Sequence, residues 1–340
     1  MAYSNNLIFA AAQLKENYLK VFIIAKSKRH TRIYYYFKKA FQRQGHRTRW
    51  IKYLKLKSYL GERAATAAVD KLMAAAKPDL LFFHGRDISC ELLRRAKKRM
   101  PVVMYYDDCI RGSRRSFEDV VNQGRLADIM YLTNRGEVAR YRELGVNARF
   151  ITGGCDPAAH RMIGSPDPMY QSDVAFIGKP NTPERAEFMQ LLAKKFDLKL
   201  WGSGWEKYGL GVAAKDVYAA EYRQICAGAK IVLGWNIDPT IELYFSNRTW
   251  YTLGCGGFLL TAYSPSLEEI FGRGRELDWF ETVEECCDKI AYYLQHDDER
   301  REIAAAGYRL AHGEYSYDAM VNRIVEDVKE AQSSKLKAQR

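Results

Sequence analysis

Several features that would assign a chain to a common special class are missing from these 340 residues. The longest apolar runs, such as VFIIA and DLLFF, have the length of a strand and are far too short to span a bilayer. No basic segment precedes the short apolar patch near the N-terminus, so we expect no signal peptide. The seven cysteines contain no CxxC pair, which predicts reduced thiols in a cytoplasmic globular protein.

Two further absences concern charge. No Asp-x-Asp motif occurs, so the chain has no short motif of the kind that binds a diphosphate through a metal ion, and we expect no metal. The stretch 26–57 contains twelve Lys or Arg residues and no Asp or Glu. Solvated surfaces usually mix the two signs, because like charges repel and opposite charges at helical spacing attract. This stretch therefore calls for a functional explanation.

The positive charge is concentrated in one half of the chain. Residues 1–160 hold 31 Lys plus Arg against 14 Asp plus Glu, a balance of +17. The remainder holds 22 against 27, or −5, and the two sum to the net charge of +12. Such an asymmetry bears on the partners of a protein and not on its fold.

Short apolar runs alternate with amphipathic stretches, which predicts parallel sheets covered on both faces by helices. In the first half we expect strands at 21–25 and 49–53, in DLLFFHG, PVVMYYDD and ADIMYLTN, and at 148–152, with helices over 33–44 and 62–76. A second series follows with DVAFIG, a helix over 183–195, LKLWG, KIVLGWN and GGFLLT. The segment 153–172 is rich in Gly, Pro, Ser and Asp and predicts the domain boundary. We thus expect a basic domain over 1–160, a second domain over 172–325, and a helix end and tail over 326–340.

The second half resembles a known family. The run NRTWYTLGCGGFLLT at 247–261, followed by SLEEIF, ETVEECCDKIAYYLQHDDERREIAAAGY and the His and Tyr of HGEYSY, is similar to the spore-maturation (CgeB-like) glycosyltransferases. VAFIGKPNTPER and LWGSGW look like the first two strand-loop units of the same family's nucleotide-binding domain, so the resemblance covers roughly 172–325. It implies the α/β GT-B fold, in which two Rossmann-like doubly wound domains face each other across a cleft. It also implies a nucleotide-sugar donor such as a UDP-sugar or GDP-sugar, used without a metal ion.

The chemistry of a diphosphate singles out candidate donor-binding residues. We expect Ser246 to cap the helix that follows it, which would leave the N–H groups of Asn247, Arg248 and Thr249 free for an anion. The Arg248 side chain adds a charge that can bind two phosphate oxygens. Gly178 and Lys179, at the end of a strand, are expected to approach the same phosphates.

The resemblance adds further donor-site candidates. Arg185 matches an Arg of the family pattern, and Glu268 and Glu269 match its acidic pair. Trp205, in the loop GSGW, is a candidate platform for the nucleobase. One position departs from the pattern, because Tyr251 stands where many relatives have a Glu that can hydrogen-bond the ribose.

The first domain is expected to supply the catalytic base. Asp107 and Asp108 follow the strand PVVMYYDD, and His84 ends a neighbouring strand, so all three should face the cleft. Inversion and retention of the anomeric configuration both stay open, since a retaining mechanism needs no protein base.

The basic residues of the first domain also fall in loops after strands, which predicts an anionic acceptor. The nearby aromatic residues suit stacking on an exposed or flipped base, so a hydroxylated base in DNA is the preferred acceptor, as for phage-type DNA glycosyltransferases. The candidate acceptor-binding residues are Lys26, Lys28, Arg29, Arg32, Arg86, Arg111, Arg114 and Arg115.

Two alternatives stay open. The first is a glycosyltransferase that acts on a lipid-linked or cell-surface polysaccharide acceptor and docks on an anionic membrane. The second is a non-catalytic nucleic-acid-binding module with this fold, a reading that Tyr251 in place of Glu favours and the intact Arg248 opposes.

Overall fold

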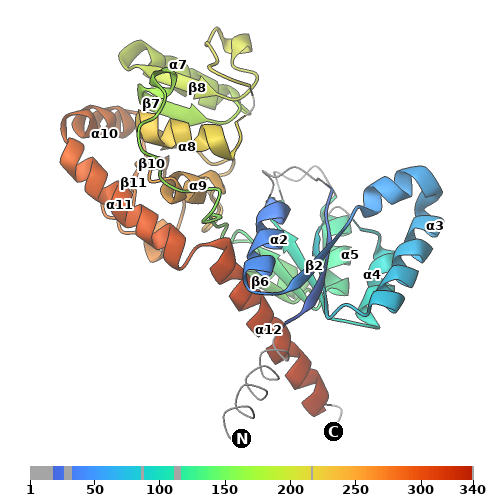
Figure 1. Cartoon of the computed structure of the whole chain (residues 1–340). Coiled ribbons are helices and arrows are strands. Elements are labelled where there is room, and N and C mark those ends of the chain that lie inside the picture. The colour runs from blue at the N-terminus through green and yellow to red at the C-terminus, as the bar shows by residue number, and fades with distance from the viewer. Residues whose placement is uncertain (1–17, 27–32, 86–87, 111–115, 216, 339–340) are drawn as a thin grey trace, which may run out of the picture.

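The computed structural model describes residues 18–26, 33–85, 88–110, 116–215 and 217–338, which form two α/β domains (Figure 1). Each domain is built around a sheet whose strands all run parallel. The α/β fold class predicted from the alternation of strands and helices is confirmed.

The N-terminal sheet has six strands in the order β2-β1-β3-β4-β5-β6. Both β3 and β4 are buried along their whole length, because helices cover both faces of the sheet. The strands are β1 (Lys20–Ile24), β2 (Arg47–Ile51), β3 (Leu80–His84), β4 (Val102–Tyr106), β5 (Ile129–Leu132) and β6 (Ala148–Phe150). The helices between them are α2 (Ile33–Arg43), α3 (Tyr53–Ala76), α4 (Cys90–Lys97), α5 (Phe117–Leu126) and α6 (Val138–Glu143).

The C-terminal sheet has five strands in the order β11-β10-β9-β7-β8. Its strands are β7 (Ser172–Ile177), β8 (Leu198–Trp201), β9 (Ala229–Gly234), β10 (Leu259–Ala262) and β11 (Asp278–Phe280). The helices are α7 (Pro183–Lys195), α8 (Ala219–Gly228), α9 (Arg248–Gly254), α10 (Val283–Gln295) and α11 (Asp297–Gly313). Short 3₁₀ turns occur at η1 (Pro168–Tyr170), η2 (Glu206–Tyr208) and η3 (Leu267–Glu269).

The last helix, α12 (Tyr317–Ala338), returns to the N-terminal domain (Figure 1). Tyr317, Val321 and Ile324 belong to the same buried cluster as residues of β1 and α2. Arg43 of α2 pairs with Asp318 and with Asp156 in the linker, which fixes this arrangement. The domain limit placed at residue 325 from the sequence falls inside α12, and buried residues on both sides of it pack on the N-terminal sheet.

Most predicted elements agree with the structure, and the helix over 183–195 agrees at both ends. One difference lies in α3, predicted from Glu62, which begins at Tyr53. Gly61 interrupts it with φ 76° and ψ 163°, a conformation that glycine adopts at little steric cost. No helix of the described residues is both long and apolar enough to cross a bilayer.

Candidate functional site

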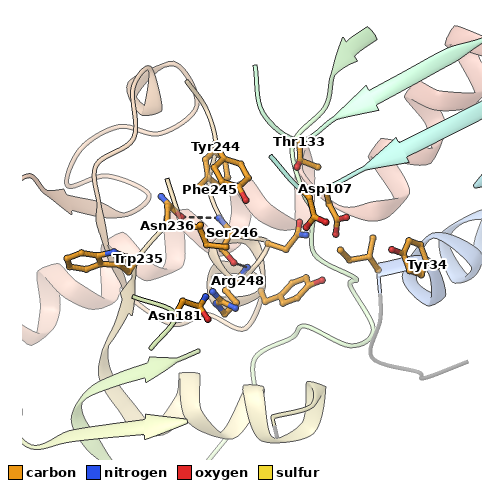
Figure 2. A pocket seen from close by; sticks show the side chains of 15 residues that line it. Tyr34, Asp107, Thr133, Asn181, Trp235, Asn236, Tyr244, Phe245, Ser246 and Arg248 are labelled. Carbon is orange, nitrogen blue, oxygen red and sulfur yellow. Dashed lines mark hydrogen bonds between the residues drawn. The ribbon is translucent and has the colours of Figure 1, made fainter. Parts of the chain in front are cut away.

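A cavity of about 370 Å³ lies between the two domains, at the carboxyl ends of their strands (Figure 2). In both sheets the strand order reverses close to it, between β1 and β3 in one and between β7 and β9 in the other. Such reversals are where doubly wound sheets bind ligands. The lining residues are Ile33, Tyr34, Asp107, Asp108, Thr133, Asn181, Trp235, Asn236, Ile237, Tyr244, Phe245, Ser246, Asn247, Arg248 and Tyr251.

The N-terminal wall of the cavity carries carboxylates. Asp107 and Asp108 follow β4, and His84 ends the neighbouring strand β3. Nε2 of the buried His84 lies 2.7 Å from Oδ1 of Asp107, and the ring of Tyr34 packs edge-on against the imidazole. The histidine thus fixes the orientation of a carboxylate that can accept a proton from a substrate hydroxyl. The three residues predicted from the sequence thus lie together, with His84 behind Asp107 and outside the cavity lining, and their catalytic role stays a prediction.

The C-terminal wall carries a guanidinium group at the start of α9. The side chain of Arg248 lines the cavity and makes no hydrogen bond or ion pair with any residue that the structure describes. Figure 2 shows it beside Asn181 on the wall opposite Asp107. A partly buried cation without a counter-ion is suited to bind an anionic ligand.

Two of the three amides predicted to be free at this helix start, those of Arg248 and Thr249, are not available. Oγ of Ser246 accepts from Arg248 N at 3.3 Å, and the Ser246 carbonyl accepts from Thr249 N at 2.9 Å. Ser246 thus takes two of the three amides that we expected an anion to use. The residue at the N-cap position is Asn247 instead of Ser246, and its side chain makes no capping hydrogen bond. Any anion here would be held by side chains, chiefly by Arg248.

Arg185 is completely buried and stands behind the cavity wall. Its guanidinium donates to the carbonyls of Lys179 at 3.0 Å and of Trp235 and Asn236 at 3.3 Å. Burial, together with the nearby Arg248, lowers the pKa of Arg185 to about 10. Arg185, a donor-binding candidate in the sequence analysis, therefore does not line the cavity but ties together the loops that follow β7 and β9.

Gly178 approaches Arg248 closely, since a Cβ at this position would lie 3.7 Å from Arg248 Cζ. Its carbonyl accepts from Trp205 Nε1 at 2.9 Å, and Trp205 itself is completely buried in the domain core. The expectation that Trp205 presents its ring to a nucleobase is therefore wrong. Lys179 is exposed next to Gly178, outside the cavity lining.

The acidic pair also lies away from the cavity. Glu269 pairs with Arg135 of the N-terminal domain through both guanidinium nitrogens, and Glu268 accepts from Tyr263 at 3.1 Å. Arg135 also pairs with Glu242, and these contacts lower the pKa values of Glu242 and Glu269. The donor-site role expected of Glu268 and Glu269 does not agree with this placement, in which Glu269 joins the two domains.

Tyr251 lines the cavity but directs its hydroxyl to another residue. The hydroxyl lies 3.3 Å from that of Tyr317 on α12, and the ring stacks on His160 with centroids 4.1 Å apart. Burial raises the pKa of Tyr251 and lowers that of His160 to about 3, so the imidazole is neutral at physiological pH. Tyr251 therefore connects α9 to α12, which packs on the N-terminal domain.

The sequence reasoning missed several cavity residues: Asn181, Trp235, Asn236, Thr133 and Tyr244. Each follows a strand or precedes α9, so position at a strand end was the available signal. Among the predicted acceptor residues, the structure describes only Lys26, which is exposed just after β1. Lys28, Arg29, Arg32, Arg86, Arg111, Arg114 and Arg115 lie outside the described residues.

Within the described ranges, no group of three or more His, Cys, Asp or Glu side chains is placed to hold a metal ion. The metal-free mechanism stays a prediction.

Comparisons with known proteins agree with this architecture. Residues 185–326 match the family described as "Glycosyl transferase-like". The spore protein CgeB of Bacillus subtilis is 23% identical over 224 residues, which cover 59% of this chain and 68% of that protein. Anabaena HepE, solved in complex with UDP and glucose, superposes with a TM-score of 0.66 at 14% identity, over 92% of this chain and 100% of the other. Sucrose-phosphate synthase from Thermosynechococcus elongatus gives 0.65 at 11% identity, over 93% and 100%.

The sequence match and the fold lead to the same class. The expected GT-B architecture is confirmed by the structural neighbours, and the family match lies on the domain that carries Arg248. The chain is a GT-B glycosyltransferase.

Proposed function

We propose that this enzyme transfers a sugar from a nucleoside-diphosphate donor held at Arg248 to a hydroxyl group activated at Asp107. One observation carries the proposal: a guanidinium that has no counter-ion among the described residues and a His-bound carboxylate line the same cavity from opposite domains. A sugar positioned between them would have its leaving group on one side and its acceptor on the other.

The donor side suits a diphosphate. Arg248 is free to form charge-assisted hydrogen bonds, and no described carboxylate pairs with either Arg248 or Arg185. The partly exposed Trp235, at the same wall, can pack against a nucleobase. Because HepE was solved with UDP and with UDP-glucose, a UDP-sugar is the first donor to test and a GDP-sugar the second.

The acceptor side suits proton removal. His84 contacts Oδ1 of Asp107, and the carboxylate lines the cavity, where it can accept the proton of an attacking hydroxyl. The hydroxyl oxygen then bonds to the anomeric carbon as the bond to the diphosphate breaks, and the diphosphate takes the electron pair. A base placed in this way favours inversion of the anomeric configuration.

The decisive experiment measures release of the nucleoside diphosphate from UDP-glucose, UDP-N-acetylglucosamine and GDP-mannose. We expect the wild-type protein to hydrolyse one of them slowly, and Arg248→Ala to abolish this hydrolysis. Arg309→Ala, which removes an exposed arginine of α11, is the matched control and should retain the wild-type rate. If the wild-type protein neither hydrolyses nor binds any of the three donors, the proposed enzymatic function is wrong and the alternative of a non-catalytic nucleic-acid-binding module is favoured.

For the acceptor we infer an anionic polymer, with a hydroxylated base in DNA as the first to test. The support is the balance of +17 over residues 1–160 and the exposure of Lys26 beyond β1. Arg47 and Arg49 are exposed on the edge strand β2 and extend the positive surface. Counter-ion release from DNA would favour binding to such a surface.

Mass spectrometry distinguishes the acceptors. DNA containing hydroxymethylated pyrimidines and a bacterial lipid extract are incubated separately with the protein and the active donor. A sugar adduct on the DNA, with affinity for duplex DNA that falls steeply as salt rises, supports the DNA acceptor. An adduct found only on lipid overturns it in favour of the membrane alternative.

A further inference from the structure

Asn236 is the second residue after β9, and two contacts fix it in place. Its side-chain Oδ1 accepts from the Ser246 amide at 3.1 Å, and its carbonyl accepts from Arg185 Nη2 at 3.3 Å. The residue is only 5% exposed, and its side chain lines the cavity (Figure 2). One contact comes from the loop before α9 and the other from helix α7.

The other end of this side chain lacks a partner. Nδ2 of Asn236 is buried and makes no hydrogen bond within the part of the chain that the structure describes. The identity of this atom is clear, because the Ser246 N–H is a donor and must face the amide oxygen. Buried amide donors are nearly always paired in folded proteins, so an unpaired one at a cavity wall indicates an acceptor that arrives with a ligand.

The surroundings of Nδ2 select the chemistry of that acceptor. Asn236 and Arg248 line the same cavity, and both also line a small recess beneath it, together with Ser246. Arg185 adds a second positive charge at the carbonyl of Asn236. A ligand oxygen in this region is surrounded by donors and cations, which favours an anionic oxygen over a neutral one.

We propose that Asn236 Nδ2 donates a hydrogen bond to a phosphate oxygen of the donor's diphosphate, beside the Arg248 guanidinium. This inference rests on the proposed function, since it requires the diphosphate to bind at Arg248. The hydrogen bond strengthens as negative charge develops on the departing diphosphate, so Asn236 stabilises the leaving group. Ser246 and Arg185 act as positioning residues that keep Asn236 in this orientation.

The test compares nucleotide binding by Asn236→Asp, Asn236→Ala and the wild-type protein. Asn236→Asp keeps an oxygen for the Ser246 amide but replaces the Nδ2 donor by a carboxylate oxygen. UDP and GDP are the probes, and the one that binds the wild-type protein more tightly is followed together with its monophosphate and its nucleoside. We expect Asn236→Asp to weaken diphosphate binding by about 100-fold, because two anionic groups would then meet, and to change nucleoside binding little. The diphosphate affinity of Asn236→Ala should lie between those of Asn236→Asp and the wild-type protein.

A pH series separates ligand contact from a structural role. Protonation of the new carboxyl restores an O–H donor at this position, so the deficit of Asn236→Asp relative to the wild-type protein should shrink between pH 7 and pH 5. The deficit of Asn236→Ala should stay constant over this range. Asn322→Asp, an exposed position on α12, controls for the added charge and should bind like the wild-type protein. Thermal unfolding checks that each variant is folded.

The outcomes distinguish this inference from the proposed function. If Arg248→Ala loses diphosphate binding while both Asn236 variants bind as the wild-type protein does, the role of Asn236 is overturned and the proposed function stands. Equal losses for diphosphate and nucleoside, without recovery at pH 5, also overturn it, because they indicate a structural defect. If the wild-type protein binds neither UDP nor GDP, both proposals fail.

Discussion

The two walls of the cavity have charges opposite to those of the domains that supply them. Residues 1–160 carry a balance of +17, yet this half contributes Asp107, Asp108 and the histidine that holds one of them. The remaining residues carry −5, yet they contribute Arg248 with Arg185 behind it. The sign of the charge at a binding site therefore follows from the chemistry of the site and cannot be predicted from the net charge of the domain that supplies it.

Part of the positive charge of the first domain is engaged in ion pairs outside the cavity lining. Arg95 and Arg99, on and just after α4, pair with Asp70 of α3 at the surface of the domain. Arg43 pairs with Asp156 and Asp318 at the contact with α12. Such residues serve solubility and domain packing, so only a fraction of the charge balance is available for an acceptor.

The largest expected effect comes from the acidic wall. Asp107→Asn removes the proton acceptor while an amide of the same shape can still contact His84, and we expect kcat to fall by about 10² to 10⁴-fold. Steady-state kinetics with the acceptor that proves active would measure this. Asp298→Asn, an exposed position on α11, is the control. An unchanged kcat for Asp107→Asn would remove the base from the mechanism and favour retention.

The cationic wall should give the next largest effect. Arg248→Ala is expected to lower kcat/KM by about 10² to 10³-fold, because the leaving diphosphate loses its charged partner. Arg248→Lys keeps the charge without the forked geometry and should recover part of the loss. If Arg248→Lys and Arg248→Ala were equally active and both close to wild type, the diphosphate would have to bind elsewhere.

Arg185 should affect stability more than Arg248 does. Arg185→Met leaves three carbonyls without their donor, and we expect the free energy of unfolding to fall by about 3 kcal/mol. Arg248→Ala should leave it nearly unchanged, since that guanidinium has no partner among the described residues. Urea unfolding of the two variants measures both values. A stable Arg185→Met variant would contradict the positioning role.

The smallest effect concerns the ion pairs between the domains. Arg135 lowers the pKa values of Glu242 and Glu269, so their contribution to domain association is present at neutral pH and is lost as pH falls below the ordinary value of 4.5. Small-angle scattering should show slight expansion of the protein at low pH. The Arg135→Ala variant should be expanded already at neutral pH, and its size should change less on acidification. If the wild-type protein and the variant expand equally at low pH, groups other than these ion pairs control the expansion.

Sequence reasoning succeeded where local pattern determined position. Buried strands such as β3 and β4 appear as continuous apolar runs, and parallel strands bring the residues after them to one edge. Asp107 and His84 could be placed for this reason, whereas Arg248 was placed from the expected start of a helix.

Sequence reasoning failed where the position of a side chain depended on a partner that is distant in the sequence. Trp205 lies in a short glycine-rich loop, but the loop folds inward because the indole packs on Phe176 and donates to the Gly178 carbonyl. Glu269 pairs with a residue 134 positions earlier, which no local pattern reveals. Asn236 was missed because a single Asn after a strand has no spacing that distinguishes it from a turn residue.

The central claim is that one wall of the cavity binds the diphosphate through Arg248 and the other supplies the base, Asp107. Its most direct test compares UDP binding by Arg248→Ala and Asp107→Asn using calorimetry, with GDP in place of UDP if the wild-type protein binds GDP more tightly. The account predicts that Arg248→Ala loses about 100-fold in affinity, while Asp107→Asn binds as tightly as the wild-type protein or more tightly, because a negative charge has been removed from the cavity. Loss of affinity in Asp107→Asn together with wild-type affinity in Arg248→Ala would contradict it.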